Sequence, residues 1–144
     1  MSDVLLLDSG VWLAAHDPDD RFHTAAQDLV SFGPDQRDLA ALDLTLFEVA
    51  NVAIRRWRSV ERARRVTELV EIAVADRLER VDGETLWATV DDADDYGLSA
   101  YDAAYVTIAR RRGWLRISCD HRDLVQPGHA VSPEQVARPV AAAS

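Results

Sequence analysis

The stretch LLLDSGVWLAA, residues 5–15, decides how the chain begins to fold, because a buried strand turns here into a helix. Successive leucines are typical of a strand that is covered on both faces. The strand ends at Asp8, and Ser9 and Gly10 follow before the chain becomes apolar again. A carboxylate is costly at the end of a buried strand, so Asp8 is expected to cap the next helix or to serve a function.

Apolar strands and helical patterns alternate along the rest of the chain. We expect further strands at 38–43, 77–81 and 114–118, a weak edge strand at 129–132, helices near 9–15, 21–32, 44–57, 59–76, 84–96 and 101–112, and a helical turn at 120–124. This order predicts an α/β fold, a single three-layer domain with a central, mainly parallel sheet of four to five strands flanked by helices. Prolines near the C-terminus place the domain at residues 1–132 and a loose tail at 133–144.

Composition limits the chemistry of the chain. The net charge is −9, and all 16 basic residues are Arg, which excludes reactions that need a catalytic lysine, such as those of a P-loop or a Schiff base. The acidic balance argues against tight nonspecific binding of nucleic acid. Cys119 is the single cysteine, and no apolar run reaches the length of a membrane span, so a soluble cytoplasmic protein without a membrane partner is expected.

Four acids interrupt segments that otherwise form the core: Asp8, Glu48, Asp102 and Asp120. Asp8 and Asp120 follow predicted strands, and ligands of open α/β sheets bind beyond the carboxyl ends of the strands. If the four carboxylates converge there, their repulsion must be offset by cations or shifted pKa values. Because the chain has no lysine, a divalent metal is the simplest answer, and oxygen ligands favour Mg²⁺ or Mn²⁺.

Helix capping is the structural alternative for each acid taken singly. The segments from Thr45 to Glu48 and from Ser99 to Asp102 both match the capping box, in which an acid at the third helical position bonds back to the N-cap. Asp8 fits the N-cap of the helix that begins at Ser9. Capping alone, however, does not require four acids at the ends of four core segments.

Four segments together resemble the signature segments of PIN-domain ribonucleases, in the same order as in that family: LLLDSGVWLA, TLFEVANVAIR, GLSAYDAAYVTIARRRG and LRISCDHRDL. The resemblance covers residues 4–125 and is strongest to VapC-type toxins of bacterial toxin–antitoxin pairs. It implies a PIN-like (Rossmann-like) fold and Mg²⁺-dependent endoribonuclease activity, with Mn²⁺ as a substitute. It also implies a homodimer and inhibition by a cognate antitoxin protein.

The resemblance assigns roles to individual positions. Asp8, Glu48, Asp102 and Asp120 match the acidic quartet, with Asp8, Asp102 and Asp120 as metal ligands and Glu48 as a further ligand or an aid to proton removal. Three positions match residues that support the acids: Ser9 beside the first acid, Asn51 one turn after Glu48, and Ser118, where the family often has threonine.

Basic segments are candidates for binding the RNA phosphates. Residues 55–65, RRWRSVERARR, carry six arginines and one glutamate. Arg55, Arg56, Trp57 and Arg58 are the candidate contacts to RNA or antitoxin, with a solvated helix face as the alternative. A second basic cluster comprises Arg110, Arg111, Arg112 and Arg116, whereas Asp91, Asp92, Asp94 and Asp95 are expected to form a solvated acidic helix end.

Two rival functions remain. A phosphatase with Asp8 as nucleophile is disfavoured, because Gly10 stands where a second acid is needed and no lysine is present. A noncatalytic PIN-like protein that only binds RNA or a partner is the alternative, and retention of all four acids favours the enzyme. The sequence does not reveal the RNA target, the antitoxin or the number of metal ions.

Overall fold

The computed structural model describes residues 4–31 and 38–136. Its elements in chain order are β1 (Val4–Leu7), α1 (Ser9–Ala15), α2 (His23–Val30), β2 (Asp38–Leu42), α3 (Asp43–Arg55), α4 (Val60–Val74), β3 (Leu78–Glu79), α5 (Gly83–Tyr96), α6 (Ala100–Arg112), β4 (Leu115–Ile117), the π-helical turn η1 (His121–Val125) and α7 (Pro133–Val136).

The central sheet is parallel throughout and has the strand order β3-β2-β1-β4. In its register Leu6 of β1 lies beside Ala40 of β2 and Arg116 of β4. The predicted α/β fold with a four-stranded parallel sheet is therefore confirmed. Because all strands run the same way, the carboxyl ends of β1 and β4 lie at one edge of the sheet, where Asp8 and Asp120 follow.

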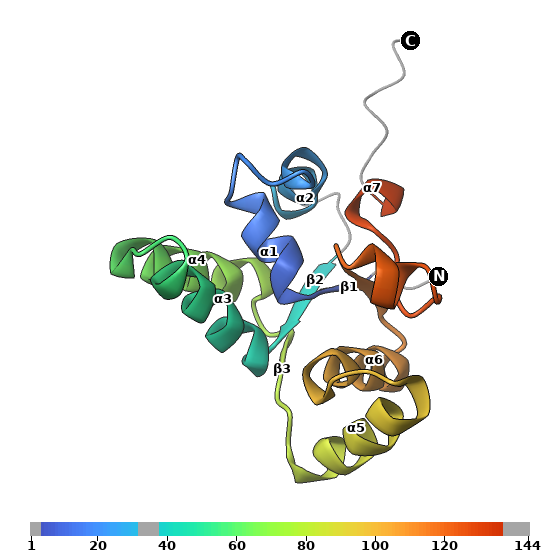
Figure 1. Cartoon of the computed structure of the whole chain (residues 1–144). Helices are drawn as coiled ribbons and strands as arrows, with labels where there is room; N and C mark the ends of the chain where they lie inside the picture. The colour runs from blue at the N-terminus through green and yellow to red at the C-terminus, as the bar shows by residue number, and fades with distance from the viewer. Residues whose placement is uncertain (1–3, 32–37, 137–144) are drawn as a thin grey trace.

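Helices cover both faces of the sheet (Figure 1), and alternate residues of each strand face opposite layers. Leu5 and Leu7 of β1 pack in the larger core with α1, α2 and α4. Leu6 packs in the smaller core with Tyr105 and Ile108 of α6. Helix α5 lies against α6 on its outer side, which completes the layered arrangement.

Several boundaries differ from those expected. Helix α3 begins at Asp43 with Leu42 as its N-cap, so Thr45 is the third helical residue, and its hydroxyl accepts from the N-cap amide. The strand expected at 77–81 contains only Leu78 and Glu79. The weak edge strand at 129–132 is reduced to one parallel bridge between Ile117 and Val131. Residues 133–136 form α7, which packs against α2, whereas residues 1–3, 32–37 and 137–144 lie outside the described part.

Glycine ends both helices of the smaller layer. Gly97 follows α5 with φ +65°, and Gly113 follows α6 with φ +67°. These left-handed conformations favour glycine because it has no Cβ. Gly113 turns the chain into β4, which brings Arg116 and Ser118 beside the end of β1. Across the described ranges no helix is both long and apolar enough to cross a membrane.

Candidate active site

Asp8 caps a helix and also lies beside a buried arginine. It is the N-cap of α1, and its carboxylate accepts a long hydrogen bond of 3.4 Å from the Val11 amide. Only 7% of the residue is exposed. Burial raises the pKa of the Asp8 carboxyl, and the Arg116 charge and a hydrogen bond with Ser118 oppose that rise. Asp8 therefore does cap α1, as the capping alternative predicts. A helix cap alone does not explain why the carboxylate is buried beside a buried arginine.

Arg116 is the site residue that the sequence analysis misassigned. Its side chain is 1% exposed, so it does not belong to a surface basic cluster. Its Nη2 atom lies 3.8 Å from Asp8 Oδ2 and 3.7 Å from Asp102 Oδ1. Because one nitrogen atom is close to both oxygens, Asp8 and Asp102 share one small volume. Burial lowers the pKa of Arg116, whereas Asp8, Asp102 and Asp120 act to raise it, and a guanidinium stays charged in either case.

Glu48 is held by Tyr105 of α6. The Tyr105 hydroxyl donates to Glu48 Oε1 over 2.7 Å and lies 2.7 Å from the Thr45 hydroxyl. Thr45 Oγ1 in turn accepts from the Leu42 amide at 3.1 Å. The predicted capping box from Thr45 to Glu48 is therefore wrong, because the glutamate points toward α6 and not toward the start of its own helix. Burial raises the pKa of Glu48, and the hydrogen bond from Tyr105 opposes this.

Asp102 and Asp120 occupy the more open side of the group. Ser99 caps α6 and accepts from the Asp102 amide at 3.1 Å, as the capping box predicts for its first half. The Asp102 side chain is 40% exposed. Asp120 is exposed, and its carboxylate accepts from the Asp123 amide at the start of η1. The group is therefore open to solvent on the side of these two residues.

The structure brings the four acids into one electrostatic group. The charges of Asp8, Asp102 and Asp120 act on Arg116, and those of Asp8, Asp102 and Arg116 act on Glu48. Among the described residues, no three His, Cys, Asp or Glu side chains are placed to hold one ion directly. Mg²⁺ commonly binds through one or two carboxylates and retains several waters. The paired carboxylates around one cationic atom fit that kind of donor set.

The supporting residues have different positions. Ser118 is buried, hydrogen bonds with Asp8 and accepts from the Asp120 amide at 3.0 Å, so it links the two acids. Ser9 is the first residue of α1 and is half-buried. Asn51 is exposed, and the residue that hydrogen bonds to Glu48 is Tyr105. The orienting role predicted for Asn51 stays a prediction. Tyr105 had a signal in the sequence, since a buried tyrosine hydroxyl usually finds a partner.

The two predicted basic clusters differ in exposure. Arg55, Arg56 and Arg58 are exposed at and beyond the end of α3. Trp57 is half-buried against the larger core, and Arg62 Cζ lies 3.9 Å from the centre of its ring. One face of this indole is therefore already covered within the protein, which leaves the neighbouring arginines as the accessible part of the segment.

The second cluster is held in internal contacts. Arg110 pairs with Asp92 at 2.7 Å, and Arg112 pairs with Glu79 at 2.8 Å. Asp92 is only 5% exposed and also accepts from the Thr107 hydroxyl at 2.6 Å. The expectation that Asp92 is solvated is therefore wrong, because α5 turns it toward α6. Burial acts to raise the pKa of the Asp92 carboxyl. The hydrogen bonds from Thr107 and Arg110 outweigh this effect and lower the pKa.

Residues 5–127 match the sequence pattern of the PIN domain family. The chain is a PIN domain. PIN domains are generally nucleases, and the match spans all four acids of the site. Among curated proteins, none matches this PIN domain in sequence.

Solved structures share the fold of this PIN domain. PAE2754 from Pyrobaculum aerophilum is 21% identical with a TM-score of 0.64, over 95% of this chain and 96% of that one. A toxin–antitoxin complex from Klebsiella pneumoniae is 18% identical with a TM-score of 0.65, over 90% and 97%. The sarcin–ricin loop cleaving toxin VapC20 from Mycobacterium tuberculosis is 21% identical with a TM-score of 0.63, over 86% and 95%. These likenesses concern the fold.

Proposed function

We propose that this PIN domain is a Mg²⁺-dependent endoribonuclease that hydrolyses RNA phosphodiester bonds. The observation that carries the proposal is the convergence of Asp8 and Asp102 on one cationic atom, with Glu48 and Asp120 in the same electrostatic group. The VapC20 toxin, which has the same fold, is described as cleaving the sarcin–ricin loop, and this supports RNA as the substrate class.

Each acid has a part in the proposed reaction. Asp8, Asp102 and Asp120 are the residues that would hold the ion, Asp8 and Asp102 as the close pair and Asp120 through a retained water, with Mn²⁺ as an alternative to Mg²⁺. When bound, a divalent ion lowers the pKa of water and neutralises charge that develops on the phosphate. The raised pKa of Glu48, caused by burial, suits a carboxylate that completes the metal site or takes a proton from the attacking water. Tyr105 holds the carboxylate of Glu48 in place through its hydroxyl.

RNA phosphates need cations outside the buried group. Arg116 is enclosed and serves the carboxylates, so the exposed Arg55, Arg56 and Arg58 are the proposed contacts to RNA or antitoxin. Trp57 belongs to the same segment, although Arg62 covers one face of its ring. Contact through these arginines predicts binding that weakens as the salt concentration rises.

RNA cleavage by the purified chain tests the proposal. With Mg²⁺ and a structured RNA, we expect cleavage that EDTA abolishes and that falls at least about a hundredfold in Asp8→Asn and Asp102→Asn, because each substitution removes a ligand charge. Asp94→Asn removes an exposed acid of α5 and serves as the matched control. Cleavage that persists in Asp8→Asn would refute the site. RNA binding without cleavage by the wild-type protein would favour the noncatalytic alternative.

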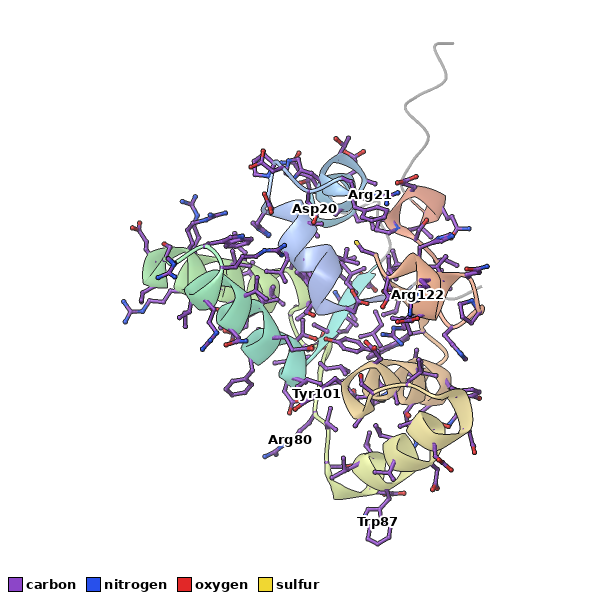
Figure 2. All side chains as sticks on the ribbon, in the orientation of Figure 1. Asp20, Arg21, Arg80, Trp87, Tyr101 and Arg122 are labelled. Carbon is purple, nitrogen blue, oxygen red and sulfur yellow. The ribbon has the colours of Figure 1, made fainter. Side chains whose placement is uncertain are left out.

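We further propose that the chain is the toxin of a toxin–antitoxin pair, forms a homodimer and is held inactive by its antitoxin. Structures with its fold include a toxin–antitoxin complex, which supports such a partner. Large apolar side chains are also exposed on α3 and α5, among them Phe47 and Trp87, which projects away from α5 (Figure 2). Co-expression with the small protein of the adjacent reading frame should suppress cleavage. Light scattering should give twice the chain mass of 16.0 kDa.

A further inference from the structure

Arg116 is held in the acidic group by contacts that do not involve the carboxylates. Its Nη1 atom donates to the backbone carbonyl of Asp102 over 2.9 Å. Its Cζ atom lies 5.0 Å from the centre of the Tyr105 ring, which is buried beneath it. Strand β4 fixes its backbone beside Leu6 of β1. The guanidinium is therefore positioned by backbone, ring and strand pairing.

The carboxylates approach the guanidinium without clamping it. The distances from Nη2 to Asp8 and Asp102, 3.8 and 3.7 Å, exceed those of hydrogen bonds. Within the described part of the chain, neither Nη2 nor Nε of Arg116 has a hydrogen-bond partner, although both atoms are buried. Arg116 therefore attracts Asp8 and Asp102 through its charge and not through hydrogen bonds. The oxygen lone pairs of both carboxylates stay available to bind a metal ion.

We propose that Arg116 is a fixed cation of the acidic pocket and takes the place of a second divalent ion, so that this PIN domain binds a single metal ion. The inference rests on the proposed metal site. Ions in two-metal sites lie about 3.5–4 Å apart and are bridged by shared ligands. The guanidinium already lies 3.8 and 3.7 Å from oxygens of Asp8 and Asp102, the carboxylates that two ions would have to share. A second divalent ion would have to share these carboxylates with a buried charge of the same sign.

The fixed cation also sets the state of the pocket before metal binds. Four carboxylates without a cation would repel one another and open the ends of β1 and α6, whereas Arg116 offsets part of their charge. The pocket is therefore formed in advance, and its metal affinity is lower than four unopposed acids would give. Arg116 acts as a positioning residue, since its side chain is closed to solvent and lies beside the proposed ligands Asp8 and Asp102.

Titration of the full-length, metal-free chain with Mn²⁺, followed by calorimetry and by the electron paramagnetic resonance signal of free Mn²⁺, tests the inference. We expect one ion per wild-type chain. Arg116→Met should bind Mn²⁺ at least about tenfold more tightly or take up a second ion, because it removes a buried positive charge that lies 3.8 and 3.7 Å from oxygens of the proposed ligands Asp8 and Asp102 and repels a divalent ion. Arg116→Lys keeps the charge and should retain one ion. Arg112→Met, which removes an arginine paired with Glu79, is the matched control and should match wild type.

Two results would overturn the inference: two ions bound by the wild-type chain, or unchanged stoichiometry and affinity in Arg116→Met. If Arg116→Met does not fold without metal, its unfolding midpoint is measured with increasing Mn²⁺. We expect this midpoint to rise more than that of wild type. An equal or smaller rise would also contradict the inference. Should the variant not fold even with Mn²⁺, the wild-type stoichiometry decides. A wild-type chain that binds one Mn²⁺ but leaves RNA intact would refute the nuclease proposal and leave this inference standing.

Discussion

Replacement of Tyr105 by phenylalanine is expected to destabilise the protein, because its hydroxyl joins α6 to Glu48 and Thr45 of α3. Tyr105 is 2% exposed, and its hydroxyl makes 2.7 Å contacts with both Glu48 and Thr45. A hydrogen bond to a charged group contributes about 1.5–3 kcal/mol, and a neutral one about 0.5–1.5 kcal/mol. Phenylalanine fills the same space, so the loss should come from these bonds and amount to about 2–4 kcal/mol in the free energy of unfolding.

The pH dependence identifies Glu48 as the source of the loss. Burial raises the pKa of Glu48 in the folded protein above the ordinary glutamate value of 4.5, and the bond from Tyr105 counteracts this. A raised pKa means that stability falls as the pH rises through the folded value. Tyr105→Phe should raise this pKa further, so the difference from wild type should be larger at pH 7 than at pH 4. Tyr105 keeps its proton at neutral pH, since burial raises its own pKa well above the usual value.

Urea unfolding followed by circular dichroism at pH 4 and pH 7, without metal, measures this effect. Tyr101→Phe is the matched control, because Tyr101 lies on the same helix and is 63% exposed (Figure 2). A surface change of this kind should stay within about 0.5 kcal/mol of wild type. Equal stability of Tyr105→Phe and wild type, or a loss that is independent of pH, would refute the reasoning.

Further predictions concern the buried acids. Asp92→Asn should destabilise the protein by about 1.5–3 kcal/mol at pH 7, because Asp92 accepts charge-assisted bonds from Thr107 and Arg110. Since the pKa of Asp92 is lowered, its contribution is lost as the pH falls through the folded value, so urea midpoints of variant and wild type should converge below about pH 4. The metal-free wild type should become more stable as the pH falls from 7 through the raised pKa values of Asp8 and Glu48, which burial places above their ordinary values. Asp8→Asn should weaken that dependence in the same unfolding assay, and an unchanged slope would contradict the assignment to Asp8.

The strands, the helices and the four acids could be predicted from the sequence because each has a local signal. The leucines at 5–7 predict a buried strand. Because ligands of parallel sheets bind beyond the carboxyl ends of the strands, Asp8 and Asp120 are expected at the same edge. Periodicity likewise predicts α3 to α6 within a few residues. These features depend on neighbours in sequence, so no knowledge of the packed structure is required.

Arg116 and Asp92 could not be placed in the same way, because their burial depends on packing between distant segments. In WLRIS the single arginine, Arg116, stands between two apolar residues, a pattern that predicts a solvent-facing side chain, yet Tyr105 of α6 covers it. Asp92 follows Thr85 and Thr89 at helical spacing, a polar stripe that reads as a wet helix face. Asp92 instead faces Thr107 and Arg110, which supply the partners that make its burial possible.

Asp8 is the N-cap of α1, and burial disfavours its negative charge. Replacement by alanine and replacement by asparagine both remove that charge, but they affect the stability of the fold differently. Alanine would delete the helix cap, whereas asparagine would retain a capping oxygen and relieve the cost of enclosing an anion. Asparagine is therefore the substitution that would remove this carboxylate at least cost to the fold. Loss of the proposed nuclease activity by that route would come with a gain in stability.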